Sequence, residues 1–164
     1  MTRHSFLTRV AAMIGCLFCL TLPLAAQPAG NATAAVLVTG ASSGIGRTIT
    51  ELLAARGHFV YAGARKQEDI DALNAIRNVQ AVKLDVTSAT DIAAAVQTVQ
   101  RAGRGLYGVV NNAGVAIIAP LIEVDEKELA FLFDVNVYGP YRVTKAFAPL
   151  LIESKGRITT ISSI

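Results

Sequence analysis

Thr39-Gly40-Ala41-Ser42-Ser43-Gly44-Ile45-Gly46 is the stretch of sequence that decides the fold. The run before it, residues 34–38, is continuously apolar and predicts a strand buried on both faces. The stretch after it predicts a helix that stops at Gly57, because glycine readily takes the positive φ needed where a helix ends. Apolar residues of this helix recur at the spacing of one buried face, and they are Ile45, Ile49, Leu52 and Leu53.

A strand, a glycine-rich loop and a helix in this order predict a binding site for an anion. The free N–H groups of the first helical turn point into the loop, and the helix dipole adds about half a positive charge there. Glycine also leaves room for a pyrophosphate to approach the backbone. The same glycines would serve in simple turns, but three of them between a buried strand and a helix favour contact with phosphate.

After this first unit, strands and helices keep alternating along the chain. Further strands are predicted at residues 58–64, 79–86, 106–110 and 157–162. One helix turns Ile70, Leu73 and Ile76 inward, and a long helical stretch covers about residues 125–154. Another helix buries Ile92, Val96 and Val99, with Thr87 or Ser88 as its N-cap and Gly103 at its end.

This alternation predicts an α/β fold, a Rossmann-type doubly wound parallel sheet of about five strands. Ligands of such sheets bind at the carboxyl ends of the strands, where the strand order reverses. Each unusual polar cluster of the sequence follows a predicted strand, which places all of them on that edge of the sheet. The clusters are residues 39–46, 64–66, 85–87, 111–114 and 162–163.

Composition argues against several other kinds of protein. With 52% hydrophobic and 16% charged residues among 164, the chain does not have the composition of a disordered protein. Removing Arg3 and Arg9 from the 15 basic residues leaves 13 against 12 acidic ones, with no basic stripe. We therefore expect no nucleic-acid partner. We also expect no metal site, because His58 has no second His or Cys after it.

Residues 1–28 form a different kind of segment. Arg3 and Arg9 precede an apolar run from Val10 to Leu22, and small residues follow Pro23, which is the pattern of an export signal. The run is short for a membrane span. We expect an exported, periplasmic protein with a cleaved signal; a membrane anchor, or a cytoplasmic protein with a misassigned start, are the alternatives. Both cysteines lie in this segment, so no disulfide indicates the compartment of the remainder.

Four motifs in order make residues 34–164 resemble the short-chain dehydrogenase/reductase family. The glycine-rich stretch 39–46 matches the glycine motif of the family, and Asn111-Asn112-Ala113-Gly114 matches its fourth-strand motif. Asn136 matches its helix asparagine, and residues 161–163 match the fifth-strand segment that carries its catalytic serine. The resemblance implies hydride transfer between a nicotinamide and a small carbonyl or alcohol substrate, and a homo-oligomer for the full-length protein.

The resemblance also implies the site residues. Ser163 is the catalytic serine, with Ser162 as second choice, and Asn136 extends the proton relay. Three of these residues have an alternative, purely structural role: Asn136 at a helix kink next to Pro140, Asp85 as a helix cap, and Asn112 as a residue that holds the turn. The cofactor-binding residues are Thr39, Gly40, Ser42, Ser43, Gly44, Ile45, Gly46, Arg65, Lys66, Asp85, Val86, Asn112, Ala113 and Gly114.

The end of the second strand predicts the choice of cofactor. Sites that select NAD place a carboxylate there for the ribose hydroxyls. Here Ala64 occupies that position, and Arg65 and Lys66 follow it. A guanidinium binds a 2′-phosphate in bidentate fashion, so we expect NADP(H) rather than NAD(H). The alternative is that both cations belong to a solvated helix start.

The catalytic tyrosine and lysine of the family should follow the serine strand. The sequence stops at Ile164, and Tyr141 with Lys145 fits Tyr-x-x-x-Lys only by letters, since the pair precedes that strand. We therefore expect a truncated NAD(P)-binding Rossmann domain at residues 34–164, from an NADP(H)-dependent oxidoreductase. The alternative is a non-catalytic dinucleotide-binding module or a decayed gene product. Ile117, Ile118 and Leu121 are candidates for either a substrate-pocket wall or a core anchor of their loop.

Overall fold

The computed structural model describes residues 35–162, which belong to one compact unit, Thr33–Ile164. The segment 1–28 that resembles an export signal lies outside the described residues. No helix between residues 35 and 162 has both the length and the apolar character that a membrane span needs.

Five parallel strands form one sheet in the order β3-β2-β1-β4-β5. This confirms the predicted doubly wound fold, and the order reverses between β1 and β4. The observed strands are shorter than predicted, and several residues at the predicted ends lie in the loops that flank the sheet. Their bounds are β1 Val36–Val38, β2 Val60–Ala64, β3 Val79–Lys83, β4 Gly108–Asn111 and β5 Arg157–Thr160.

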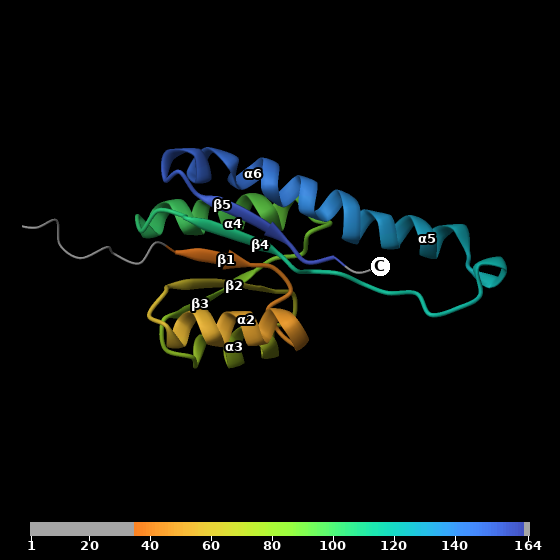
Figure 1. Ribbon diagram of the computed structural model, residues 1–164, viewed down its shortest axis with the longest axis horizontal. Helices are drawn as coiled ribbons and strands as arrows, with labels where there is room; N and C mark the ends of the chain where they lie inside the picture. The colour runs from red at the N-terminus through yellow and green to blue at the C-terminus, as the bar shows by residue number, and fades with distance from the viewer. Residues whose placement is uncertain (1–34, 163–164) are drawn as a thin grey trace, which may run out of the picture. The chain divides into compact units, whose positions relative to one another are not determined.

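Helices cover both faces of the sheet (Figure 1). Helices α2 (Gly44–Ala55) and α3 (Gln67–Asn74) pack on one face, over a core that includes Val38, Val60 and Leu73. Helices α4 (Ala89–Ala102) and α6 (Gly139–Glu153) pack on the other face, over a core that includes Leu37, Val109 and Phe147. The two apolar clusters thus sandwich β1, as its continuously apolar sequence predicts.

The buried face of α2 differs from the predicted one. Ile45 and Leu52 are 60% and 48% exposed, while Gly46, Thr50 and Ala54 form the buried stripe. The physical reason is size, since these small residues let the helix backbone lie close to the sheet. The Thr50 hydroxyl is satisfied by donating to the Gly46 carbonyl at 2.8 Å. Ile49 and Leu53, also predicted to face the core, do pack partly against it.

The long helical stretch is interrupted at its middle. It consists of α5 (Glu126–Phe133), a π-helical turn η2 (Asp134–Tyr138) and α6. Pro140 has no N–H to donate to the Asn136 carbonyl, which accounts for a break in the α-helical ladder at this point.

The segment between β4 and α5 contains a short 3₁₀ turn η1 (Leu121–Glu123) and reaches beyond the carboxyl ends of the strands (Figure 1). Ile118 and Leu121 are 98% and 79% exposed, so these two residues do not take the second of their two alternative roles, that of core anchors.

A capping serine and a terminal glycine set the limits of helix α4. The Ser88 hydroxyl accepts from the Asp91 N–H at 3.2 Å, and Gly103 ends the helix with φ of 64°.

Candidate functional site

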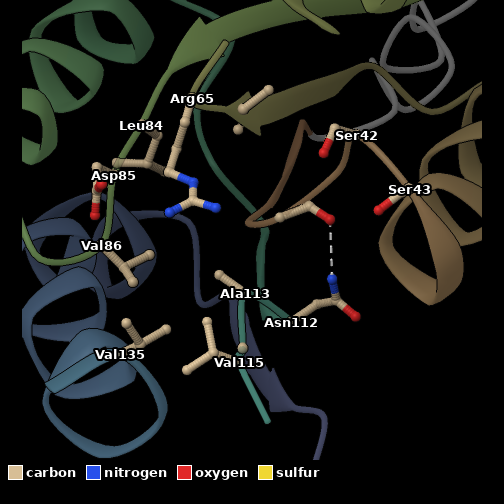
Figure 2. A pocket seen from close by; sticks show the side chains of 14 residues that line it. Ser42, Ser43, Arg65, Leu84, Asp85, Val86, Asn112, Ala113, Val115 and Val135 are labelled. Carbon is tan, nitrogen blue, oxygen red and sulfur yellow. Dashed lines mark hydrogen bonds between the residues drawn. The ribbon is translucent and has the colours of Figure 1, made fainter. Parts of the chain in front are cut away.

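A pocket of about 270 Å³ lies at the carboxyl ends of the strands, on both sides of the β1–β4 reversal (Figure 2). Figure 2 shows Ser42 and Ser43 on one side of it and the side chains of Val86, Val115 and Val135 on another. Nine of the fourteen predicted cofactor-binding residues line this pocket, brought together from loops far apart in the sequence. They are Gly40, Ser42, Ser43, Arg65, Asp85, Val86, Asn112, Ala113 and Gly114.

The three motif glycines have three different physical roles. Gly40 has φ of 62°, and a Cβ there would lie 2.8 Å from the Ala113 Cα, so glycine is needed for both conformation and contact. A Cβ on Gly46 would collide with the Gly40 carbonyl and the Asn112 amide. Gly44 has φ of 54° and open space around it, at the first turn of α2. Gly44 does not line the pocket, and its positive φ is the reason that glycine suits this position.

Hydrogen bonds from Asn112 and Thr39 hold the glycine loop in place. The Asn112 side-chain nitrogen donates to the Thr39 and Gly40 carbonyls at 3.0 and 3.1 Å. The buried Thr39 hydroxyl accepts from the backbone N–H groups of Asn112 and Ala113, both at 3.0 Å. Thr39 does not line the pocket, and both side chains act on its shape by fixing β1 to β4. The side-chain nitrogen of Asn112 thus holds the turn, which is the alternative role predicted for this residue.

Arg65 and Lys66 behave differently although they are neighbours. The Arg65 side chain lines the pocket, and Figure 2 shows its guanidinium directed into the space between Asp85 and Ser42. Lys66 is the N-cap residue of α3, and its ammonium lies 3.4 Å from the Glu68 carboxylate at an exposed position. Both residues are exposed, but Arg65 lines the pocket, whereas Lys66 fits the solvated-helix-start alternative.

Asp85 is held in a fixed orientation at the pocket edge. One carboxylate oxygen accepts from the Thr87 N–H at 2.9 Å and from the Thr87 hydroxyl at 2.7 Å. Burial alone would raise the pKa of Asp85, but the Thr87 hydrogen bonds and the positive charge of Arg65 outweigh it and lower the pKa below its ordinary value. Asp85 is not the cap of α4, because Ser88 has that role.

Asn136 lies inside the π-helical turn and binds the loop after β4. Its side-chain oxygen accepts from the Val115 N–H at 2.9 Å, and its nitrogen donates to the Val115 carbonyl at 2.8 Å. This two-point contact fixes the backbone next to Gly114, which lines the pocket. π-helical turns inside α-helices occur frequently at functional sites. Asn136 therefore connects the break in the helix to the loop after β4, and its part in a proton relay stays a prediction.

The predicted reaction centre is described only in part. Ser163 lies outside the described residues, and the second choice, Ser162, is exposed. Tyr141 and Lys145 lie on α6, where the lysine ammonium is 3.4 Å from the tyrosine hydroxyl. They line a groove against α4 rather than the pocket at the strand ends. Between residues 35 and 162, no group of three His, Cys, Asp or Glu side chains is arranged to hold a metal.

Some lining residues were not among the predicted ones. Leu84 and Val135 directly precede Asp85 and Asn136, so adjacency to predicted site residues was the available signal. Gly63 likewise precedes the strand end at Ala64. Val115 carried no signal in the sequence, because its place depends on the hydrogen bonds from Asn136. Of the remaining predicted residues, Gly44, Ile45 and Gly46 are the first three of helix α2 and do not line the pocket.

The sheet order, the glycine loop at its reversal and the pocket define an α/β protein of the Rossmann type with a nucleotide-binding geometry. A sequence model of the short chain dehydrogenase family matches residues 34–164. The chain belongs to the short-chain dehydrogenase/reductase family. This confirms the resemblance seen in the motifs.

Three similar proteins illustrate the relation. Short-chain dehydrogenase PC-15 of Penicillium crustosum is 40% identical over 131 residues, covering 79% of this chain and 48% of the relative. NADPH-dependent 1-acyldihydroxyacetone phosphate reductase of Schizosaccharomyces pombe is 37% identical, covering 79% and 44%. The alcohol dehydrogenase of Thermococcus sibiricus, solved with 5-hydroxy-NADP, has a TM-score of 0.73 and 28% identity, covering 77% and 57%. The chain spans about half the length of the curated relatives it matches.

Proposed function

We propose that this chain binds NADP(H) as the cofactor-binding part of an oxidoreductase acting on a small carbonyl or alcohol substrate. The observation that carries the proposal is Arg65 at the carboxyl end of β2, with its guanidinium directed into the pocket. No carboxylate stands at the preceding residue, Ala64, where NAD-selective sites place one. The relative from Schizosaccharomyces pombe, named as NADPH-dependent, supports the same choice.

The residues that line the pocket are of kinds that suit a dinucleotide. Ser42 and Ser43, just before the N-terminus of α2, suit the pyrophosphate, and the fixed Asp85 carboxylate suits hydrogen-bond donors of the adenosine half. Arg65 would hold a 2′-phosphate by charge-assisted hydrogen bonds. When bound, the nicotinamide would supply or accept the hydride. This chain contributes the binding site, and Asn136 fixes the backbone at Val115 beside that site.

Cofactor preference is tested by calorimetric titration of the whole chain with NADPH and with NADH. Arg65→Ala should weaken NADPH binding about 10-fold to 100-fold and leave NADH binding within about threefold, since one charge-assisted contact is worth about 1.5–3 kcal/mol. Arg56→Ala is the matched control, because it removes an exposed arginine at the far end of α2. Equal affinity of the native chain for both cofactors, or an equal loss of both in Arg65→Ala, would contradict the proposal.

Turnover is a separate question from binding. The family pattern places a tyrosine and a lysine after the serine strand, and the pair Tyr141 and Lys145 lies elsewhere, on α6. NADPH oxidation with a panel of small ketones and aldehydes distinguishes the oxidoreductase from the alternative, a binding module without turnover. A chain that binds NADPH tightly but oxidises none of it would favour the binding module.

We also propose export of the protein on its N-terminal segment, from the order of Arg3, Arg9 and the apolar run that follows. N-terminal sequencing of protein recovered from the cell envelope fraction tests this. A first residue after about position 26 supports a cleaved signal, whereas an intact Met1 in the cytoplasm contradicts it.

A further inference from the structure

One arginine braces the π-helical turn from outside the pocket. The Arg142 guanidinium donates to the Asp134 carboxylate at 2.7 Å and to the Asp134 carbonyl at 3.4 Å. It also lies 5.7 Å from the ring centroid of Tyr138. Asp134 and Tyr138 are the first and last residues of the turn, so a single planar group contacts both of its ends.

The opposite side of the same turn shapes the pocket. Val135 is buried and lines it, and Asn136 holds Val115 by the two hydrogen bonds described above. Immediately after the turn, a Cβ on Gly139 would lie 2.7 Å from a methyl group of Val86, another lining residue. A shift of the turn would therefore be felt at three points of the pocket wall.

A π-helical turn needs such a brace because it departs from the regular i to i−4 hydrogen-bond ladder. The guanidinium is suited to the task, since its donors lie in one rigid plane and reach a carboxylate and a carbonyl together. The two side chains are 35% and 36% exposed, so the pair is partly screened by water and its contribution is modest.

We propose that Arg142 and Asp134 are positioning residues that hold the π-helical turn, and through Asn136 the backbone at Val115, in the geometry that receives the dinucleotide. The binding part of this inference rests on the proposed function. The structural part, from Arg142 to Val115, does not depend on any cofactor.

The first experiment measures amide hydrogen exchange by NMR without cofactor, because the Val115 N–H donates to Asn136. Arg142→Gln and Asp134→Asn should each raise the Val115 exchange rate about twofold to fivefold, and the double variant should raise it no further. Arg142→Lys should also raise the Val115 exchange rate, since an ammonium lacks the planar fork of a guanidinium. Arg101→Gln is the matched control, an exposed helical arginine whose guanidinium donates to Gln97 on α4.

The results that would overturn the inference are specific. Unchanged Val115 exchange in both single variants contradicts it, and so does an equal rise at Val115 and at the central strand residue Leu37, which would report general destabilisation. In the second experiment, the NADPH dissociation constant should rise about twofold to fivefold in Arg142→Gln and in Asp134→Asn, and stay unchanged in Arg101→Gln. If the native chain binds no NADPH while Val115 responds as expected, the proposed function fails and the positioning role stands.

Discussion

At the scale of single residues, Asp85 combines two features that pull in opposite directions. It is partly buried, which disfavours its charge, yet it accepts two hydrogen bonds from Thr87 and faces the positive charge of Arg65. The second set of effects dominates, and the pKa lies below the ordinary value. The ionised carboxylate thus stabilises the folded state, and it is fixed in one orientation before any ligand arrives.

This shift predicts a pH dependence with a definite sign. Because the folded pKa of Asp85 is lowered, its contribution is present above the ordinary aspartate pKa of about 3.9 and is lost as the pH falls through the folded pKa. The difference in unfolding free energy between native protein and Asp85→Asn should be at most about 1 kcal/mol near pH 7, since water screens the group. It should shrink below about pH 4.

Urea unfolding measured from pH 3 to pH 7 checks this prediction. Thr87→Val serves as companion variant: it removes the hydroxyl donor and should move the acid loss of stability to higher pH. A difference between native protein and Asp85→Asn that grows on acidification would show that the sign is wrong.

At the scale of elements, the start of α6 depends on one missing side chain. A Cβ on Gly139 would lie 2.7 Å from a Val86 methyl carbon and 3.1 Å from the Val86 Cβ. The helix therefore packs directly against Val86, which lies in the loop after β3. Gly139 has φ of −57°, an ordinary helical value, and close contact rather than conformation therefore requires glycine.

Gly139→Ala should destabilise the protein by about 1–3 kcal/mol, the usual cost of overpacking. Val86→Ala in the same chain should recover part of this loss by making room, which a double-mutant cycle of unfolding free energies would reveal. The matched control is Gly156→Ala, whose Cβ would instead meet Tyr107 and Leu151 and which Val86→Ala should not rescue. Strict additivity of Gly139→Ala and Val86→Ala would contradict the contact.

At the scale of the whole described unit, the pocket joins the two halves of the sheet. Arg65 and Asp85 come from the β2–β3 side, while Asn112 and Val135 come from the β4 and α5 side. A ligand that fills the pocket would contact both halves and would bind only when both are folded. Binding should therefore stabilise the unit as a whole.

NADPH at about 100 times its dissociation constant should add about 2.7 kcal/mol and raise Tm by roughly 10 °C for a unit of this size. Differential scanning fluorimetry with an extrinsic dye suits this measurement, since the chain has no tryptophan. Arg65→Ala should lose most of the shift with NADPH at the same concentration. If calorimetry shows that the chain binds NADPH but Tm does not change, the unfolded chain binds NADPH as well as the folded chain does.

Much of this protein could be predicted from residues 39–46 and the alternation that follows. Local patterns decide that a buried strand, a glycine turn and a helix follow each other, and parallel pairing brings the loops after the strands to one edge. The place of nine predicted residues in one pocket follows from those two facts. The family could be named for the same reason, because its glycine motif and its fourth-strand motif lie at this edge.

Other features were decided only by tertiary packing. Periodicity counted Ile45 and Leu52 as buried, but the close approach of α2 to the sheet buries Gly46, Thr50 and Ala54 instead. Arg65 and Lys66 are both exposed, but only Arg65 of the two lines the pocket. This difference depends on how α3 leaves β2, which the sequence of the two residues does not reveal. Likewise, Val115 enters the site through hydrogen bonds to Asn136, 21 residues away. Sequence specifies local geometry, whereas contacts across long separations exist only once the chain is folded.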